Sequence, residues 1–239
     1  MQAFDNIIWD ALSGTQRPIS VGNDRIRRYA PGFPLIMAAA DPRSPDLESM
    51  EAHCDPGERL YLCGWNGPMP AGWNLEVDAA VAVMSWRGAT PEIDPRAVRL
   101  GPEHVPAMLH LFESCKPGPY ATRPMDIGEW YGVFEDGRLV AMAGERMHAG
   151  EWREVSGVAT LPECQGKGYA KRLTERVIAS QAARGLKTFL HVFPGNTRAI
   201  DLYKRMGFVV EREMPLRVMS LADAHDRARA GQPASEKVA

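Results

Sequence analysis

The sequence lacks the long apolar runs, the paired cysteines and the excess of one charge that would place it in several large classes of protein. Its longest apolar candidate, around residues 35–40, is far shorter than the ~18 residues that a membrane span needs. The net charge of −2 gives no reason to expect nucleic acid or an anionic membrane as a partner. The cysteines form no C-x-x-C pair and are too dispersed for a zinc motif, so we expect reduced thiols and no metal site; they are Cys54, Cys63, Cys115 and Cys164.

The first residues also lack the features of a secretion signal. They include Asp5 and Asp10 and contain no basic stretch. We therefore expect a cytoplasmic protein. Its 239 residues allow one large domain or two small ones, with a substantial core.

Two familiar phosphate-binding motifs are missing as well. No glycine is separated by four residues from the Gly-Lys-Ser/Thr of a P-loop. Gly166 and Gly168 begin like the dinucleotide fingerprint, but Lys171 stands where its third small residue belongs. No acidic ribose ligand follows at the expected distance either. These two nucleotide folds are therefore excluded.

What the sequence does contain is a glycine loop at residues 165–170, Gln-Gly-Lys-Gly-Tyr-Ala, between an expected strand over 154–160 and an expected helix that ends near 184. Glycine lets the backbone approach a ligand closely, and the first amides of a helix have no internal partners and favour an anion. From these residues alone, the loop is either a pyrophosphate site or a tight turn that binds nothing.

The chain divides near residue 94, because residues 88–95 carry two prolines and little apolar content. Before this linker we expect helices over 3–12 and 45–53, and strands over 26–29, 35–39, 59–63, 75–77 and 80–86. After it we expect a strand over 98–100, a helix over 103–113, a hairpin of 132–135 with 138–146, strands over 151–160 and 186–193, a helix from Asn196, and final strands over 208–212 and 216–219. The three predicted segments are 1–94, 95–221 and a flexible polar tail, 222–239.

Two linked motifs point to a family. Gln165, Gly168 and Ala170 are followed, across one strand, by a second set: Asn196, Ala199, Leu202, Tyr203, Gly207 and Phe208. This combination resembles the GNAT superfamily of acyl-CoA-dependent N-acyltransferases, over about residues 96–220. The stretches 142–147 and 154–160 are similar to a bacterial branch close to the glycine N-acyltransferase-like group.

The resemblance implies an α+β fold of three layers. Its mixed, mostly antiparallel sheet is flanked by helices and splays between its fourth and fifth strands, and the acyl-CoA thioester enters the gap. Residues 1–94 would form a smaller α/β unit that resembles a degenerate half-domain and serves as scaffold or acceptor-side wall.

The resemblance also implies acetyl-CoA, or another short acyl-CoA, as co-substrate. A backbone N–H of Val158 or Ala159 on the splayed strand would hold the oxyanion. Asn196 has two interpretations, as a helix cap and as a polar contact to CoA. The full set of expected donor contacts is Val158, Ala159, Thr160, Gln165, Gly166, Lys167, Gly168, Tyr169, Ala170, Asn196 and Tyr203.

Amide formation at neutral pH needs a proton acceptor, because an alkylamine has a pKa of about 10.4. The resemblance implies Glu154 as the base or its water relay, although an exposed strand carboxylate would also explain that residue. Glu145 and His191 are alternatives, as is water with no side chain involved. Tyr203 is the expected general acid, unless its ring simply packs.

The acceptor is expected near Tyr120 and Arg123, where an arginine would form a bidentate pair with a carboxylate; a solvated loop arginine is the other interpretation. We expect an N-acetyltransferase that acts on a primary amine of a small molecule or amino acid by direct attack in a ternary complex. The alternatives are a non-catalytic acyl-CoA sensor or scaffold, and an enzyme that acetylates protein N-termini or lysines. A monomer or homodimer is expected, with no nucleic acid or membrane partner.

Overall fold

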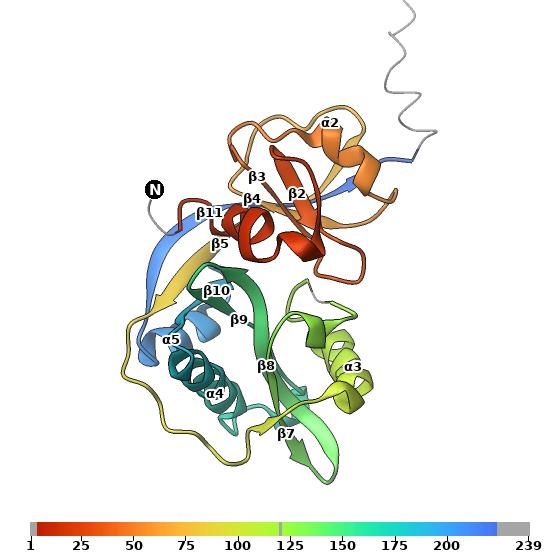
Figure 1. The fold of residues 1–239 in the computed structure, drawn as a ribbon. Coiled ribbons are helices and arrows are strands. Elements are labelled where there is room, and N and C mark those ends of the chain that lie inside the picture. The colour runs from red at the N-terminus through yellow and green to blue at the C-terminus, as the bar shows by residue number, and fades with distance from the viewer. Residues whose placement is uncertain (1–3, 120, 224–239) are drawn as a thin grey trace, which may run out of the picture.

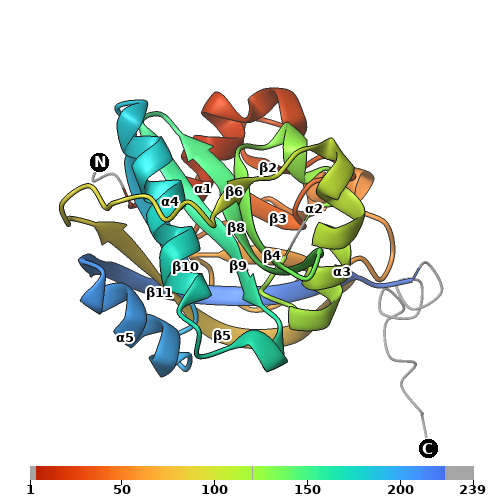
Figure 2. The ribbon, with the colours of Figure 1, turned by 90° about the horizontal axis from the view of Figure 1, so that it is seen from below.

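The computed structural model describes residues 4–119 and 121–223 (Figure 1). Within them, eleven strands form one sheet in the order β1-β2-β3-β4-β11-β5-β10-β9-β8-β7-β6. Helix α3 (Val105–Cys115) covers one face of the C-terminal strands, while α4 (Tyr169–Ala183) and α5 (Thr197–Arg205) cover the other (Figure 2). The expected three-layer arrangement is therefore confirmed. The strands are β1 (Ser20–Gly22), β2 (Ile26–Tyr29), β3 (Ile36–Ala39), β4 (Leu60–Cys63), β5 (Trp73–Trp86), β6 (Val98–Arg99), β7 (Trp130–Glu135), β8 (Arg138–Ala149), β9 (Trp152–Thr160), β10 (Lys187–Val192) and β11 (Phe208–Leu221).

Two long strands join the halves of the molecule. β5 and β11 are each 14 residues long and pair with each other from Phe208↔Trp86 to Leu221↔Trp73. β5 also pairs with β10, and β11 also pairs with β4, so each half contributes a strand to the other. The sequence predicts each as two short strands, which is wrong. Pro215 suggests a break in β11, but it lies beside Gly64 just beyond the end of β4, where its missing N–H costs little.

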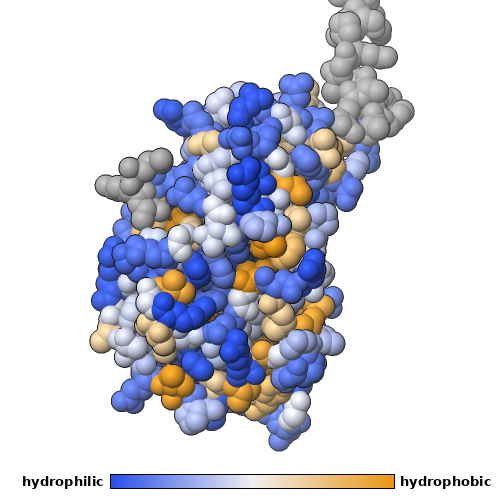
Figure 3. Space-filling view, viewed as in Figure 1, coloured by the Kyte–Doolittle hydropathy of each residue, from blue (hydrophilic) through white to orange (hydrophobic). Residues whose placement is uncertain are grey.

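The N-terminal half resembles a reduced copy of the C-terminal half. Its strands β3 and β4 are parallel and flank β11, just as the parallel pair β9 and β10 flanks β5. Its helices are short: α1 (Ile7–Asp10) continues as a π-helical turn, Ala11–Thr15, and α2 (Leu47–Met50) continues as a 3₁₀ turn, Glu51–His53. The halves meet at a waist, where apolar side chains gather on the face seen in Figure 3.

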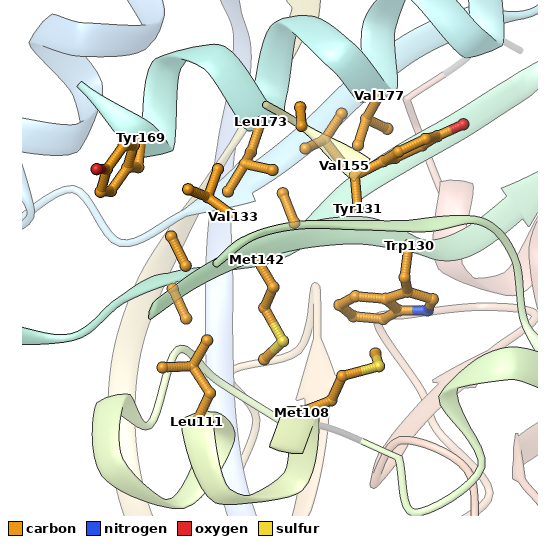
Figure 4. Close-up of a cluster of buried hydrophobic side chains, with 14 of the residues drawn as sticks. Met108, Leu111, Trp130, Tyr131, Val133, Met142, Val155, Tyr169, Leu173 and Val177 are labelled. Carbon is orange, nitrogen blue, oxygen red and sulfur yellow. The ribbon is translucent and has the colours of Figure 1, made fainter. Parts of the chain in front are cut away.

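The C-terminal half is held together by apolar side chains on both faces of its sheet. Met108 and Leu111 of α3 lie below the sheet, and Leu173 and Val177 of α4 lie above it, all of them almost fully buried (Figure 4). Each such side chain contributes about 1.5–3 kcal/mol through removal from water. This packing fixes where α4 begins, and therefore where its N-terminus points. None of the helices in the described ranges is long and apolar enough to cross a membrane.

The sheet opens between β9 and β10. Their parallel pairing covers only three positions, from Lys187↔Trp152 to Phe189↔Glu154, and then the strands separate. A bulge in β9 accompanies the separation: Gly157 has φ +60°, and a Cβ there would lie 2.5 Å from the Trp130 ring. The splay between the fourth and fifth strands of this half is thus present as expected.

Candidate functional site

The glycine loop presents free backbone amides to open space. Gly166 and Gly168 both have φ +80°, and Gly168 is the N-cap of α4. The first amide of the helix to find an intrahelical partner is that of Arg172, which donates to the Gly168 carbonyl at 3.2 Å. No protein atom lies within 4 Å of a Cβ built at Gly166. The loop therefore fits an anion such as a pyrophosphate, held by backbone N–H groups at the positive end of α4.

The side chains around this loop have separate roles. Lys167 Nζ lies 2.9 Å from both carboxylate oxygens of Glu135, and the Tyr169 hydroxyl donates to the same carboxylate. The Tyr169 ring is buried in the core of the C-terminal half. Arg198 Nη1 lies 3.5 Å from Gln165 Oε1. Sequence reasoning missed Arg198, although its position two residues after the expected helix cap would have placed it near the loop.

The β9 backbone beyond Glu154 is open on its β10 side, because the two strands no longer pair. Val158, Ala159 and Thr160 lie in this stretch, after the bulge. The Oγ1 atom of Thr160 is buried and has no hydrogen-bond partner among the described residues. A polar atom left unpaired beside an open strand edge is the kind of group that a ligand satisfies.

Helix α5 presents Asn196 and Tyr203. The Asn196 side chain accepts a hydrogen bond from the Ala199 N–H at 3.2 Å, so the capping interpretation is confirmed. The Tyr203 ring packs edge-on against Phe208, with 5.6 Å between the centroids. Burial raises the pKa of Tyr203 to about 12, and its hydroxyl has no hydrogen-bond partner within residues 4–119 and 121–223. It is therefore a neutral phenol throughout the physiological range.

A buried ionic cluster lies where β9 and β10 separate. Arg146 on β8 donates to both carboxylate oxygens of Glu154, at 2.8 Å and 2.6 Å, and Glu154 Oε1 lies 2.7 Å from His191 Nδ1. Glu154 has no solvent exposure. Burial alone would raise its pKa, but the charge of Arg146, together with the charge that His191 carries when it is protonated, outweighs burial and lowers the pKa of Glu154 to about 2. The alternative interpretation of Glu154 as an exposed strand carboxylate is therefore wrong, because the carboxylate is deeply buried.

Glu145 belongs to a different cluster. Its Oε1 accepts hydrogen bonds from Gln181 at 3.1 Å and from Arg184 at 2.5 Å, both at the C-terminal end of α4. Its Oε2 accepts the Glu129 N–H at 3.2 Å. Glu145 therefore lies on the α4 face of the sheet, away from Arg146 and its partners. Residues 4–119 and 121–223 contain no group of three His, Cys, Asp or Glu side chains suited to a metal ion.

A pocket of about 380 Å³ lies at the waist, between the N-terminal half and the connection after α3. This waist pocket is lined by Gly32, Phe33, Leu35, Arg59, Tyr61, Gly118, Pro119 and Thr122. It is coupled to the buried cluster, because Arg146 Nη1 donates to the Pro119 carbonyl at 3.3 Å. Sequence reasoning missed the contribution of Phe33 and Tyr61, since nothing in residues 1–94 signals a ligand.

Arg123 lies at the edge of this region with its charge already paired. Its guanidinium contacts Asp126 at 2.6 Å and lies 5.0 Å from the centroid of the Phe33 ring. Binding an acceptor carboxylate there would require Arg123 to exchange its partner. Tyr120, the other expected acceptor contact, falls outside the described residues.

Comparisons with known proteins agree with this geometry. The acetyltransferase (GNAT) family model matches residues 105–208. A segment of 75 residues is 43% identical to the mycothiol acetyltransferase of Streptomyces griseus; the match covers 30% of this chain and only 24% of that protein. A solved structure from Streptococcus suis, described as a GCN5-related N-acetyltransferase-like protein, shares the fold with a TM-score of 0.61 at 15% identity, over 89% of this chain and 92% of its own.

A solved structure from Novosphingobium aromaticivorans, described as an acetyltransferase of the GNAT family, is similar over the whole molecule. It covers 93% of this chain and 100% of its own, with a TM-score of 0.85 and 35% identity. The similarity thus extends over the N-terminal half as well as the splayed sheet and its glycine loop. On this identity and coverage, the chain belongs to the GNAT acetyltransferase family.

Proposed function

We propose that the protein transfers an acetyl or other short acyl group from acyl-CoA to the primary amine of a small molecule or amino acid, by direct attack in a ternary complex. One observation carries this proposal. The gap between β9 and β10 has the free amides of the glycine loop at one end and the buried Glu154–His191 pair at the other.

On the donor side, the chain offers backbone rather than side-chain contacts. The amides of residues 166–171 hold the pyrophosphate, and the open edge of β9 holds the pantetheine arm. The N–H of Val158 or Ala159 holds the thioester oxygen as charge develops on it, which is typically worth about 3 kcal/mol of barrier. Acyl-CoA supplies the activated acyl group. The name of the Streptomyces griseus relative supports acetyl as that group.

The leaving thiolate needs a proton, and we propose that Tyr203 gives it. Its hydroxyl is neutral, since burial raises its pKa to about 12, and it lacks a competing partner among the described residues. General acid catalysis of this kind contributes typically 10²–10⁴-fold. Asn196 and Arg198, at the start of the same helix, add polar contacts near the loop.

On the acceptor side, the waist pocket favours a small molecule. Its volume of about 380 Å³ lies in the usual range for small ligands, and Phe33 and Tyr61 of the N-terminal half close one wall. A protein lysine or N-terminus would need an open groove, so the waist pocket makes that alternative less favoured. Arg59 and Arg123 at its edge would suit an acceptor carboxylate, as in an amino acid, if either exchanged its present partner, Glu76 or Asp126; such an acceptor would fit the glycine N-acyltransferase-like branch.

A sensor or scaffold without chemistry is the second alternative. The buried ionic cluster argues against it, because burying charges costs several kcal/mol per ion and CoA binding alone does not need them. The proposed reaction requires neither nucleic acid nor membrane, and a cytoplasmic monomer or homodimer suffices for it.

Thiol release in the presence of acetyl-CoA and a panel of amines tests the proposed function. The panel contains amino acids, polyamines, aminoglycosides and short peptides. We expect turnover with small amines or amino acids and none with peptides. Tight CoA binding without turnover of any amine would favour the sensor, and preferential turnover of peptides would favour the protein-directed enzyme.

A further inference from the structure

A buried histidine nitrogen with no hydrogen-bond partner lies near the point where β9 and β10 separate. The His191 side chain is only 8% exposed, and its Nε2 atom has no hydrogen bond within the described residues. Buried polar groups are normally hydrogen-bonded, and leaving one unpaired costs about 1–3 kcal/mol. Because His191 lies where β9 and β10 separate, its unpaired Nε2 indicates that a ligand in this gap supplies the missing hydrogen bond.

His191 lies at the start of that opening. The last paired residues of the two strands are Phe189 and Glu154, so His191 is two positions past the end of the pairing. Its ring packs against Phe189, with 5.6 Å between the centroids, on the face of β10 that looks toward the N-terminal half and the waist pocket. Its Nδ1 reaches back to Glu154 at 2.7 Å and bridges the separating strands.

The Glu154 contact determines which nitrogen carries the proton. Glu154 is an anion held by Arg146, and a carboxylate only accepts hydrogen bonds. A neutral His191 must therefore carry its proton on Nδ1, which leaves a lone pair on Nε2. Glu154 itself is a poor proton acceptor near neutral pH, because its pKa is about 2. The three groups form a chain of hydrogen bonds: Arg146 holds Glu154 in place, and Glu154 orients the His191 ring.

On the basis of the proposed function, we propose that His191 Nε2 is the group that takes the proton from the acceptor amine. In this role His191 is a catalytic residue, and Glu154 and Arg146 are positioning residues that never touch the amine. The assignment replaces Glu154 as the base and leaves Tyr203 as the acid.

The step balances as follows. Nε2 takes one proton from the ammonium form of the acceptor, and that proton leaves to solvent when the imidazole is reset. The freed nitrogen lone pair forms a bond to the acyl carbonyl carbon, and the carbon–sulfur bond breaks with its electron pair on sulfur. After this reset, Nε2 takes the second proton that nitrogen loses and passes it to solvent, while the Tyr203 hydroxyl protonates the thiolate and regains a proton from solvent, so that one proton is released overall. The products are the amide and free CoA.

The first test is made on the wild-type protein. Nitrogen NMR of isotope-labelled histidine at alkaline pH should show His191 protonated on Nδ1 and bare on Nε2. A proton on Nε2 in this state would overturn the proposal, whether or not any amine has been turned over. The two results are distinguishable: the wrong tautomer together with amine turnover would overturn only the role of His191, whereas no turnover of any amine would overturn the proposed function, whatever the tautomer.

The second test is kinetic and uses a matched control. His191→Gln should lower kcat/KM at least 100-fold and remove the acidic limb of its pH profile, while CoA affinity and melting temperature stay close to wild type. The control is His110→Gln, the same chemical change at an exposed histidine of α3. It should leave kcat/KM and the pH profile unchanged.

A third variant keeps the test decisive if glutamine does not fit. His191→Ala should regain part of its kcat with added imidazole, which a purely structural role would not allow. Glu154→Gln should lower kcat more than it changes KM and should shift the acidic limb rather than remove it. The charged or titratable groups around Glu154 and His191 are Arg146, Tyr29, Cys63 and His148. All four are left unsubstituted in the variants whose pH profiles are compared. Activity within threefold of wild type in His191→Gln, with an unchanged profile, would overturn the proposal.

Discussion

Arg146 and Glu154 form a two-point ion pair in which the carboxylate is wholly buried. The Nε and Nη2 atoms of Arg146 donate to the two oxygens of Glu154 at 2.8 Å and 2.6 Å. Around them, Gln16 of the N-terminal half accepts from the Tyr29 hydroxyl at 2.6 Å and donates to the Arg146 carbonyl at 2.9 Å. Arg146 thus links strands β8 and β9 to the N-terminal half, and the loss of its ion pair with Glu154 should lower both stability and activity.

Arg146→Met should destabilise the fold by roughly 3–5 kcal/mol, because it leaves the Glu154 carboxylate buried without its cation. Urea unfolding at pH 7 measures the loss. The matched control is Arg138→Met, since Arg138 and Glu163 form an ion pair in which both side chains are more than half exposed. Removing that pair should cost less than about 1 kcal/mol. Equal losses in the two variants would contradict the importance of burial.

The same pair predicts an acid dependence of stability. The pKa of Glu154 falls from 4.5 to about 2 on folding, so its stabilisation is complete above its unfolded pKa and is lost as pH falls from there toward 2. The lost part is on the order of 3 kcal/mol. Urea unfolding of wild type and Glu154→Gln between pH 3 and 7 isolates it by difference. Parallel pH curves for the two proteins would refute the depressed pKa.

Gly168→Val should abolish measurable CoA binding by placing a side chain where the phosphate approaches. Gly185 at the other end of α4 is a close control, because it has φ +71° against +80° and no atom within 4 Å of a built Cβ. Each substitution should cost about 1–2 kcal/mol of stability through the positive φ. Calorimetry with CoA should separate them. Wild-type affinity in Gly168→Val would remove the loop from the donor site.

Tyr203→Phe should lower kcat about 100-fold with little change in the KM for acyl-CoA, because only the proton for the thiolate is lost. Tyr131→Phe makes the same chemical change elsewhere, where the hydroxyl donates to Glu129 at 2.8 Å. That variant should keep its kcat. Unchanged turnover in Tyr203→Phe would reduce Tyr203 to a packing residue against Phe208.

The predicted boundary near residue 94 can be tested by dividing the chain there. A fragment of residues 95–239 lacks β5 and therefore has nothing between β10 and β11. We expect it to be insoluble or to unfold without cooperativity, because two strands are left with unpaired edges. Co-expression with residues 1–94 should restore a soluble complex. Cooperative unfolding of the isolated fragment would instead show an independent domain.

By itself, the sequence determined the local elements and the donor side. Gly166, Gly168 and the helical pattern that follows predict the loop and α4, since turn chemistry and capping act over a few residues. Asn196 as the cap of α5 follows from the same short-range rules. The splay and the bulge in β9 followed from the family resemblance that these motifs carry.

The acceptor side was decided only by tertiary structure. Glu154 and His191 are 37 residues apart, and nothing local says that the end of strand pairing will bring them within 2.7 Å. Phe33 and Tyr61 become pocket walls only because β5 and β11 cross between the halves and hold them together. Glu154 is buried yet ionised because Arg146 lies beside it, and the alternation of residues along the strand did not indicate either property. Long-range packing, rather than local pattern, determines which charges are buried and which atoms are left to meet a substrate.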